Sequence, residues 1–204
     1  MVKNIIFDLG GVILDLAVPR TFEEFSKISR IPHDEVMRLF KSSEGFEHYE
    51  RGDYTDDEFR DFVRNLFHLT VDDATLDACW NAMLLGIPQN KLDLLLNLKE
   101  RYKIFLLSNT NNIHLEHINN VIMSSTAAMR ALDSYFHGAY YSHRMGMRKP
   151  EPEIFLEVLA DNGLNAEETL FLDDNMDNIQ GAAAVKIRTA FVNTTNFILD
   201  YFHE

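Results

Sequence analysis

A short apolar run, a carboxylate and two glycines follow one another in Asn4-Ile5-Ile6-Phe7-Asp8-Leu9-Gly10-Gly11-Val12-Ile13-Leu14-Asp15. Such a run is typical of a strand that is buried on both faces, as strands of parallel sheets are. Asp8 would then stand at the carboxyl end of the strand, and the glycines allow a sharp turn or the close approach of a ligand. An Asp beside Gly is also ordinary turn chemistry. The role of Asp8 therefore depends on which residues the rest of the chain brings to it.

The composition limits the kinds of partner. The 204 residues, 46% of them hydrophobic, are enough for one sizeable core or for a core with a small second module. A formal net charge of −13 disfavours nucleic acid and anionic membranes, so we expect a small molecule or a protein as partner. No apolar run reaches the roughly 18 residues of a membrane span, and the first run breaks at Asp8, unlike a signal peptide. With a single cysteine, Cys79, these features predict a cytoplasmic chain without an internal disulfide.

The order of elements predicts an α/β fold, with a doubly wound and mostly parallel sheet and an inserted helical module. Strands are expected at 4–8, 103–107, 138–142, 169–173 and 189–192, and helices at 90–101, 113–136, 151–161 and 177–185. The cluster Ser124-Ser125-Thr126 is a candidate interruption of the helix over 113–136. Strands that alternate with helices favour a parallel sheet. From about 20 to 85 the pattern is wholly helical, with capping-box spacing at Thr21–Glu24 and at Thr55–Glu58. This block is much longer than an ordinary crossover, so we interpret it as an insertion.

Polar residues follow four of the predicted strands. They are Asp8, Ser108, the loop Arg148-Lys149-Pro150, and Asp173-Asp174-Asn175. Ligands of such sheets bind beyond the carboxyl ends of the strands. Each residue also has a simpler explanation, because Ser108 and the acidic pair could serve a helix N-terminus and Lys149 could be a solvated loop charge. Their joint position at one edge of the sheet favours a common site.

These residue types predict phosphoryl transfer. Crowded carboxylates repel unless a cation lies between them, and oxygen ligands suit Mg²⁺. Lys149 would then neutralise phosphoryl oxygens, and Ser108 would donate a hydrogen bond to one of them. Asp8 can act as the nucleophile and carry the phosphoryl group as an acyl phosphate. We therefore expect a Mg²⁺-dependent phosphomonoester hydrolase that acts on a small phosphorylated metabolite.

Four motifs in this order resemble those of the haloacid dehalogenase-like hydrolases. They span the chain as Phe7-Asp8-Leu9-Gly10-Gly11-Val12, Leu107-Ser108-Asn109-Thr110, Arg148-Lys149-Pro150 and Phe171-Leu172-Asp173-Asp174-Asn175. Within that superfamily, the segments 145–150 and 50–52 are similar to the bacterial alpha-D-glucose-1-phosphate phosphatases, which suggests a sugar phosphate as substrate. The resemblance implies a Rossmann-like core, residues 1–18 and 86–204, with a helical cap, residues 19–85.

The resemblance also implies a role for each motif residue. Asp8 would be the nucleophile, and the phosphate would be held by Ser108, Asn109 and Lys149. The metal would be bound by Asp8, by the main-chain carbonyl of Gly10, by Asp174 directly and by Asp173 through water. Asn178 stands where many members carry another acidic residue and would support these ligands indirectly.

One position departs from the pattern. Most phosphatases of the superfamily carry a second Asp two residues after the nucleophile, which protonates the leaving group and then activates water, but here that position is Gly10. Three outcomes are open: the leaving group needs little help, a cap residue supplies the acid or base, or turnover is slow and the protein has another role, such as binding. The candidates in the cap are His48, Glu50 and Arg51. Because the cap closes over the substrate in this architecture, we also expect His48 and Arg51 to bind it, although a plain interhelical loop explains these residues as well.

Two further expectations follow from neighbouring residues. Dehalogenases of the superfamily also lack the second Asp, but they need no metal and would not be expected to keep the pair Asp173-Asp174. We therefore rank dehalogenation low. His114 and His117 stand three residues apart, and without a third ligand nearby we expect them on a solvated helix face.

Overall fold

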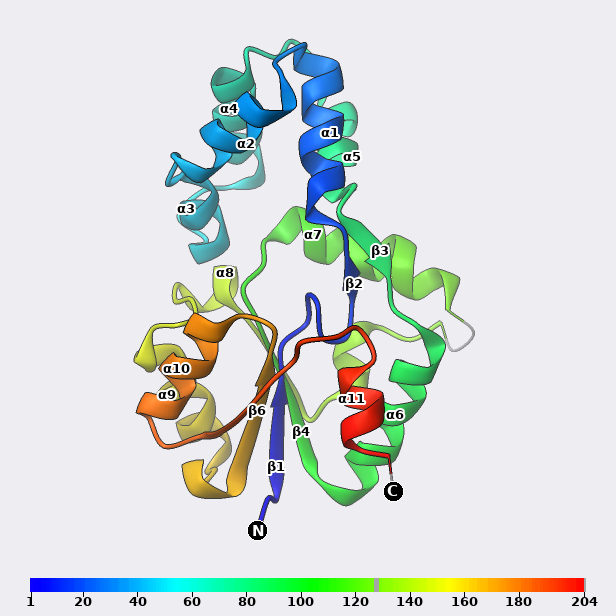
Figure 1. Cartoon of the computed structure of the whole chain (residues 1–204), viewed down its shortest axis with the longest axis vertical. Helices are drawn as coiled ribbons and strands as arrows, with labels where there is room; N and C mark the ends of the chain where they lie inside the picture. Colours follow the sequence, from blue (N-terminus) through cyan, green and yellow to red (C-terminus); the bar gives the residue numbers. More distant parts are fainter. Residues whose placement is uncertain (127–128, 204) are drawn as a thin grey trace.

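The computed structural model describes residues 1–126 and 129–203, which form an α/β core and a helical cap (Figure 1). The core sheet has five strands in the order β5-β4-β1-β6-β7, and every neighbouring pair is parallel. The strands are β1 (Asn4–Phe7), β4 (Lys103–Ser108), β5 (Gly138–Tyr141), β6 (Thr169–Asp173) and β7 (Arg188–Phe191). The predicted parallel α/β fold is confirmed, and each strand lies within about a residue of its predicted place.

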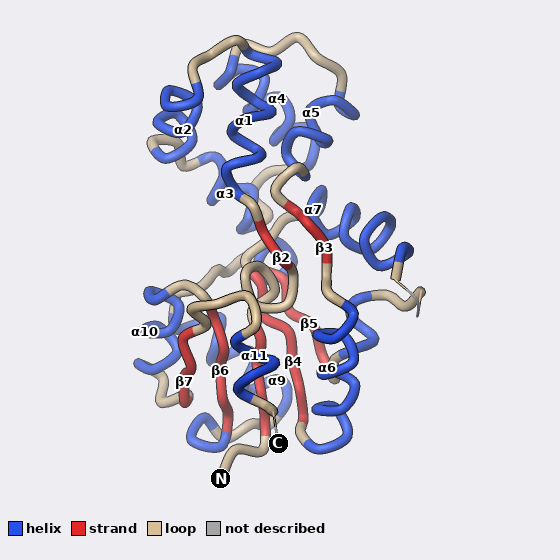
Figure 2. The backbone as a smooth tube through the Cα atoms, turned by 45° about the vertical axis from the view of Figure 1, so that its right-hand side comes forward, coloured by secondary structure: helices blue, strands red, loops and turns tan. Residues whose placement is uncertain are grey.

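The middle strand β1 is buried on both faces, which explains its unbroken apolar run. Ile5 and Phe7 belong to the core on one face, and Ile6 belongs to the core on the other. The first face is covered by α6 (Gln89–Arg101), α7 (Asn112–His117) and α11 (Phe197–Tyr201), and the second by α9 (Pro152–Asn162) and α10 (Met176–Ala184). Helices on both faces of the strands are visible in Figure 2. Burial on both faces fixes β1 in the centre and so places Asp8 at the middle of the sheet edge.

The cap is a separate helical layer over the carboxyl edge of the sheet, and both chain ends lie on the far side of the core (Figure 1). It contains α1 (Val18–Ser29), α2 (His33–Lys41), α3 (Gly45–Arg51), α4 (Asp56–Phe67) and α5 (Asp73–Asn81). Aromatic side chains dominate its core: Tyr49 stacks on Phe59 with ring centroids 3.9 Å apart, and Phe46 stacks on Trp80 at 5.5 Å. We retain 19–85 as the proposed extent of the cap.

Two short strands connect the cap to the core. They are β2 (Asp15–Leu16) and β3 (Leu84–Gly86), which pair in antiparallel fashion with Asp15 opposite Gly86. The end of the predicted helical block, 84–85, is therefore strand. Lys91 reinforces this junction, because its buried Nζ lies 2.8 Å from a carboxylate oxygen of Asp15.

One predicted helix start is wrong and the other is confirmed. Helix α1 begins at Val18 with Pro19 in its first turn, and the Thr21 hydroxyl donates to the carbonyl oxygen of Trp80 at 3.0 Å instead of capping. A tertiary hydrogen bond has replaced the local one that the spacing suggested. Thr55 and Glu58 do form the reciprocal capping box of α4.

The helix predicted over 113–136 is interrupted. The α-helical part of α7 ends at His117, a π-helical turn follows over Ile118–Ile122, and a 3₁₀ turn follows over Met123–Ser125. The hydroxyls of Ser125 and Thr126 donate at 2.7 Å to main-chain carbonyls three residues earlier, which competes with continued helical bonding. Residues 127–128 of the predicted helix lie outside the described residues, and Leu132–Tyr135 is again a 3₁₀ turn.

The remaining elements are short. They are α8 (Ser142–Met145) and a 3₁₀ turn at Ala166–Glu168. Gly163 ends α9 in the left-handed conformation, which suits glycine. Within the described part of the chain, none of the helices has the length and apolar character needed to cross a membrane.

Candidate active site

Three neighbouring strands deliver polar side chains to the same edge of the sheet. Ser108 is the last residue of β4, Asp8 follows β1 directly, and Asp173 is the last residue of β6. All three are buried, and the Asp8 amide continues the ladder by donating to the carbonyl oxygen of Leu172 at 2.9 Å. The sequence prediction that these strand ends share one site is therefore met by the geometry.

Lys149 joins the two buried carboxylates. Its Nζ lies 2.6 Å from an oxygen of Asp8 and 2.7 Å from an oxygen of Asp173, and its side chain is 1% exposed. Burial by itself lowers the pKa of Lys149, but the attraction of the two carboxylates outweighs it and holds the pKa above its usual value. Lys149 is thus a fixed positive charge in the centre of the site.

Asn109 holds the Lys149 main chain in place. The side-chain Nδ2 of Asn109 donates to the main-chain carbonyl oxygen of Lys149 at 2.9 Å. The main-chain N–H of Lys149 donates to the side-chain Oδ1 of Asn109, also at 2.9 Å. This reciprocal pair joins the end of β4 to the loop before α9. Both ends of the Asn109 side chain are therefore engaged with Lys149, although the residue also borders the cavity described below.

Three carboxylates form the acidic cluster Asp8, Asp173 and Asp174. One oxygen from each lies within 4.8 Å of the others. Burial raises the pKa of Asp8 to about 7; Lys149 acts against this shift and Asp173 adds to it. Burial, and then the neighbouring Asp173, also raises the pKa of Asp174. The cluster therefore carries more negative charge than Lys149 alone balances, and its oxygen donors fit a hard divalent cation such as Mg²⁺.

The two members of the acidic pair differ in their surroundings. Asp173 is fully buried and accepts hydrogen bonds from Lys149, from the Asn178 amide at 3.0 and 3.1 Å, and from the Asn175 main chain at 2.8 Å. Asp174 is exposed and lies against Gly11. Asp174 is thus the more accessible of the two donors, and Asn178 contacts the cluster through Asp173.

Glycine is required at position 11 for two reasons. Its φ of +73° lies in the left-handed region, and a Cβ added there would stand 2.1 Å from a carboxylate oxygen of Asp174. At Gly10 an added Cβ would stand 2.7 Å from the Leu16 side chain. Leu16 of β2 therefore occupies the space into which a side chain at position 10 would extend.

A cavity of about 310 Å³ lies between the cap and this edge of the sheet. The core contributes Gly10, Ser108 and Asn109, β2 contributes Leu16, and the cap contributes Glu50 and Trp80. Its volume is at the small end of the range for ligand pockets. Ser108, Asn109 and Thr110 line the cavity at the end of β4, so a bound molecule would place one end at Ser108 and the other against the cap.

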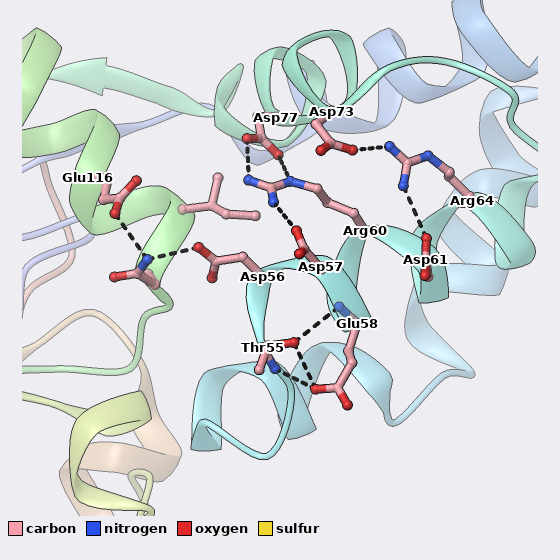
Figure 3. A network of polar contacts seen from close by, with 12 residues as sticks. Thr55, Asp56, Asp57, Glu58, Arg60, Asp61, Arg64, Asp73, Asp77 and Glu116 are labelled. Atoms are coloured by element: carbon pink, nitrogen blue, oxygen red, sulfur yellow. Dashed lines mark hydrogen bonds and ion pairs between the residues drawn. The ribbon is translucent and has the colours of Figure 1, made fainter.

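A larger hollow of about 550 Å³ is lined by α3 and α4 of the cap and by Asn112, His143 and Arg144 of the core. Several of its polar side chains contact one another: Arg60 contacts Asp57 and Asp77, and Asn112 donates to Asp56 at 2.8 Å (Figure 3). This network joins α4 to α5 and α7. We therefore place the candidate site in the smaller cavity, next to Lys149.

The three cap residues named from the sequence have different positions. His48 lies 2.8 Å from Asp53 at the surface, and Arg51 forms a bidentate ion pair with Glu151 of the core. Among the described residues, neither borders the cavity, whereas Glu50 does. The Arg148 guanidinium donates to Glu50 at 2.9 Å and lies 3.4 Å from Glu47. The structure thus brings only one of the three to the site.

The prediction that His114 lies on a solvated helix face is wrong. His114 is buried and stacks on Trp80 with ring centroids 4.7 Å apart. Its Nε2 donates to the Trp80 carbonyl oxygen at 3.2 Å, and its Nδ1 lies 3.3 Å from the Asn111 amide nitrogen. Burial lowers the pKa of His114 to about 4. His114 of the core is therefore a neutral residue that hydrogen-bonds to Trp80 of the cap.

Sequence reasoning also missed Arg148 and Leu16. Arg148 was quoted only as part of the Lys149 motif, yet it connects this loop to two glutamates of the cap. Leu16 had no signal of its own, since an apolar residue in a loop is ordinary. Only the three-dimensional position of Gly10 shows why Leu16 matters.

Comparisons with known proteins agree with this geometry. The haloacid dehalogenase-like hydrolase family profile matches residues 2–186. The chain is 32% identical to a D-ribitol-5-phosphate phosphatase of Bacteroides thetaiotaomicron, over 88% of this chain and 86% of that protein. A haloacid dehalogenase family enzyme of the same species, crystallised with magnesium and inorganic phosphate, is 39% identical, with a TM-score of 0.86 and 94% of each chain covered. A predicted hydrolase of this kind from Porphyromonas gingivalis is 30% identical, with a TM-score of 0.87 over 100% of this chain and 99% of that one.

Proposed function

Because the chain belongs to the haloacid dehalogenase-like hydrolases, we propose that it is a Mg²⁺-dependent phosphomonoester hydrolase with Asp8 as its nucleophile. The observation that carries this proposal is the buried arrangement of Asp8, Lys149 and Asp173 at the sheet edge, with Asp174 beside it. A carboxylate held next to a fixed cation and an unbalanced acidic cluster suits attack on phosphorus. The relatives crystallised with magnesium and phosphate, or named as a phosphatase, support the same chemistry.

The metal site we propose consists of Asp8, the main-chain carbonyl of Gly10 and Asp174, with Asp173 acting through water. When bound, Mg²⁺ would neutralise charge on the transferring phosphoryl group. Asp173 already has hydrogen-bond partners for both oxygens, which supports an indirect role for it. Gly11 supports the role of Asp174, because only glycine leaves room for that carboxylate.

The remaining residues bind and orient the phosphate. Asp8 attacks phosphorus with one carboxylate oxygen, and Ser108 donates its hydroxyl to a phosphoryl oxygen. Lys149 places its ammonium group against another phosphoryl oxygen, and Asn109 keeps the Lys149 main chain in position. Such fixed charges and donors supply most of the catalysis in phosphoryl transfer.

We propose a small polar phosphomonoester, a polyol or sugar phosphate, as the substrate. The cavity of about 310 Å³ has Ser108, Asn109 and Thr110 at the sheet edge and Glu50 on the cap side, and its other lining is mostly apolar. This volume suits a small metabolite, and the ribitol-phosphate phosphatase relative points to the same class. The acidic net charge of −13 and the single cysteine support a cytoplasmic location for this activity.

Gly10 favours a second candidate, a phosphate-binding protein with little or no turnover. Glycine at this position carries no acid, so the usual proton donor is absent from position 10, and the Leu16 side chain lies where a Cβ would stand. Both candidates predict binding of phosphate and Mg²⁺, and only the first predicts release of phosphate from a monoester.

Phosphate release from a panel of polyol, sugar and aryl phosphates, with and without Mg²⁺, tests the proposal. We expect release that requires Mg²⁺ and that is lost in Asp8→Asn, while circular dichroism shows an unchanged fold. Asp161→Asn, an exposed position on α9, is the matched control and should keep full activity. Activity that survives in Asp8→Asn contradicts the assignment of the nucleophile. A wild-type protein that binds phosphate but releases none from the panel establishes the second candidate.

A further inference from the structure

We propose that Glu50 of the cap is the general acid and base of the reaction, in place of the side chain that Gly10 lacks. This inference rests on the proposed phosphatase function. It assigns to a helix of the cap a role that the core fills in most phosphatases of the superfamily, and it follows from the contents of the cavity.

The core offers no substitute beside Gly10. A side chain at position 10 would meet Leu16, whose side chain is apolar and cannot transfer a proton. Lys149 is committed to Asp8 and Asp173. The proton must therefore come from another group that borders the cavity.

Among the described residues that line the cavity, two have acidic or basic side chains, namely His114 and Glu50. His114 is unsuitable because its Nε2 donates to the Trp80 carbonyl oxygen and its Nδ1 faces the Asn111 amide nitrogen. With a pKa of about 4 it is also neutral under ordinary conditions. Glu50 remains.

Glu50 is well placed for proton transfer. It borders the cavity together with Gly10, Ser108 and Asn109, so it faces the sheet edge from the cap side. Arg148 donates to Oε2 of Glu50 at 2.9 Å, and Arg148 directly precedes Lys149 in the chain. The ion pair thus connects the carboxyl group to the residue that contacts the nucleophile. It engages Oε2 and leaves Oε1 to carry the proton.

The buried position of Glu50 favours its protonated form more than exposure to solvent would. Burial raises the pKa of Glu50, and the like charge of Glu47 adds to the rise, whereas Arg148 and Lys149 act against it. A carboxyl group whose pKa is moved toward neutrality can both donate and accept a proton during turnover.

The proposed reaction has two steps, transfer of the phosphoryl group to Asp8 and its hydrolysis by water. A carboxylate oxygen of Asp8 forms a bond to phosphorus, the bond from phosphorus to the ester oxygen breaks, and that oxygen takes the proton of Glu50 and leaves as an alcohol. The Glu50 carboxylate then removes a proton from water, whose oxygen attacks phosphorus. The bond from phosphorus to Asp8 breaks, inorganic phosphate leaves, and Glu50 is protonated again.

The test compares two leaving groups in Glu50→Gln. An alkyl leaving group, as in ribitol 5-phosphate, needs a proton, whereas the nitrophenolate of p-nitrophenyl phosphate leaves without one. We expect kcat/KM for the alkyl ester to fall by about 10²–10⁴, and that for the aryl ester to change by less than about tenfold. Glu23→Gln is the matched control, because Glu23 is an exposed carboxylate on α1 of the cap that does not border the cavity among the described residues. It should leave both substrates unchanged.

A second variant separates chemistry from structure. In Glu50→Ala, added formate or acetate should restore hydrolysis of the alkyl ester in proportion to its concentration and leave the aryl ester unaffected. Equal losses for both esters in Glu50→Gln, without rescue of Glu50→Ala, would mean that Glu50 only positions Arg148 and would overturn the inference. A wild type that hydrolyses neither ester overturns the proposed function itself, whereas an active wild type with equal losses overturns only the role of Glu50.

Discussion

Replacing Gly11 by alanine tests the proposed metal site directly. The added Cβ would stand 2.1 Å from a carboxylate oxygen of Asp174, and the φ of +73° would remain in the left-handed region. Two separate effects follow, a backbone cost and a displacement of a proposed metal ligand. Gly163→Ala isolates the first effect, because Gly163 has a φ of +60° and an added Cβ there meets no described atom within 4 Å.

The size of each effect follows from the geometry. A non-glycine residue in the left-handed region costs about 1–2 kcal/mol, so both variants should lose a similar amount of stability without metal. In Gly11→Ala the Asp174 oxygen must also retreat by about 1.3 Å, from 2.1 Å to the 3.4 Å at which ordinary contact begins. Mg²⁺ requires near-ideal octahedral geometry, so we expect its affinity to fall at least about tenfold, or roughly 1.4 kcal/mol.

Calorimetric titration with Mg²⁺ and thermal unfolding with and without Mg²⁺ measure the two effects separately. At an Mg²⁺ concentration of about 100 times Kd, binding stabilises the wild type by about 2.7 kcal/mol. For a chain of this size each kcal/mol moves Tm by about 2–4 °C, so Gly11→Ala should lose about 3–6 °C of the metal-induced shift, whereas Gly163→Ala should keep all of it. An unchanged Mg²⁺ affinity in Gly11→Ala would refute the assignment of Asp174 as a metal ligand.

Three further predictions concern stability. Lys149→Met removes the cation between two buried carboxylates and should destabilise the protein by about 3–5 kcal/mol in urea unfolding at pH 7; a loss below about 1 kcal/mol would contradict the buried ion pairs. His114 has a native pKa of about 4, below its unfolded value of 6.5, so only the unfolded state gains a proton between these values. Stability should therefore be insensitive to this residue above pH 6.5 and fall by up to about 3 kcal/mol as the pH drops to 4, and His114→Gln should flatten that slope. Thr55→Ala removes the cap of α4 and should cost about 1 kcal/mol in the same assay, whereas a cost near zero would mean that the capping box adds no stability.

The sequence was informative wherever an element's own residues determine its structure. The apolar runs predicted the central strands β1, β4 and β6, because burial on both faces of a sheet favours apolar side chains. The motifs at the ends of β1, β4 and β6 predicted which side chains meet, because parallel strands present their carboxyl ends at one edge. The capping box at Thr55 is equally local.

The errors arose where tertiary contacts decided the outcome. Thr21 has the spacing of a helix cap but bonds to Trp80, which is distant in sequence. His114 was expected in solvent, yet the cap lies over it and burial makes it a neutral hydrogen-bonding residue. The contact between Leu16 and position 10 could not be predicted either, because it depends on how the loop after β1 folds back.

The antiparallel pair of β2 and β3 has a consequence for how this architecture can be altered. Asp15 and Gly86 lie opposite one another, so the chain leaves the core and returns to it at almost the same point. The intervening residues form a module whose two ends are adjacent, and a short turn could join those ends without moving any strand of the sheet. The module can therefore be exchanged for another of different length as a single cassette. Proteins that share this core could diverge in substrate by replacing the cassette while the sheet and its edge stay unchanged.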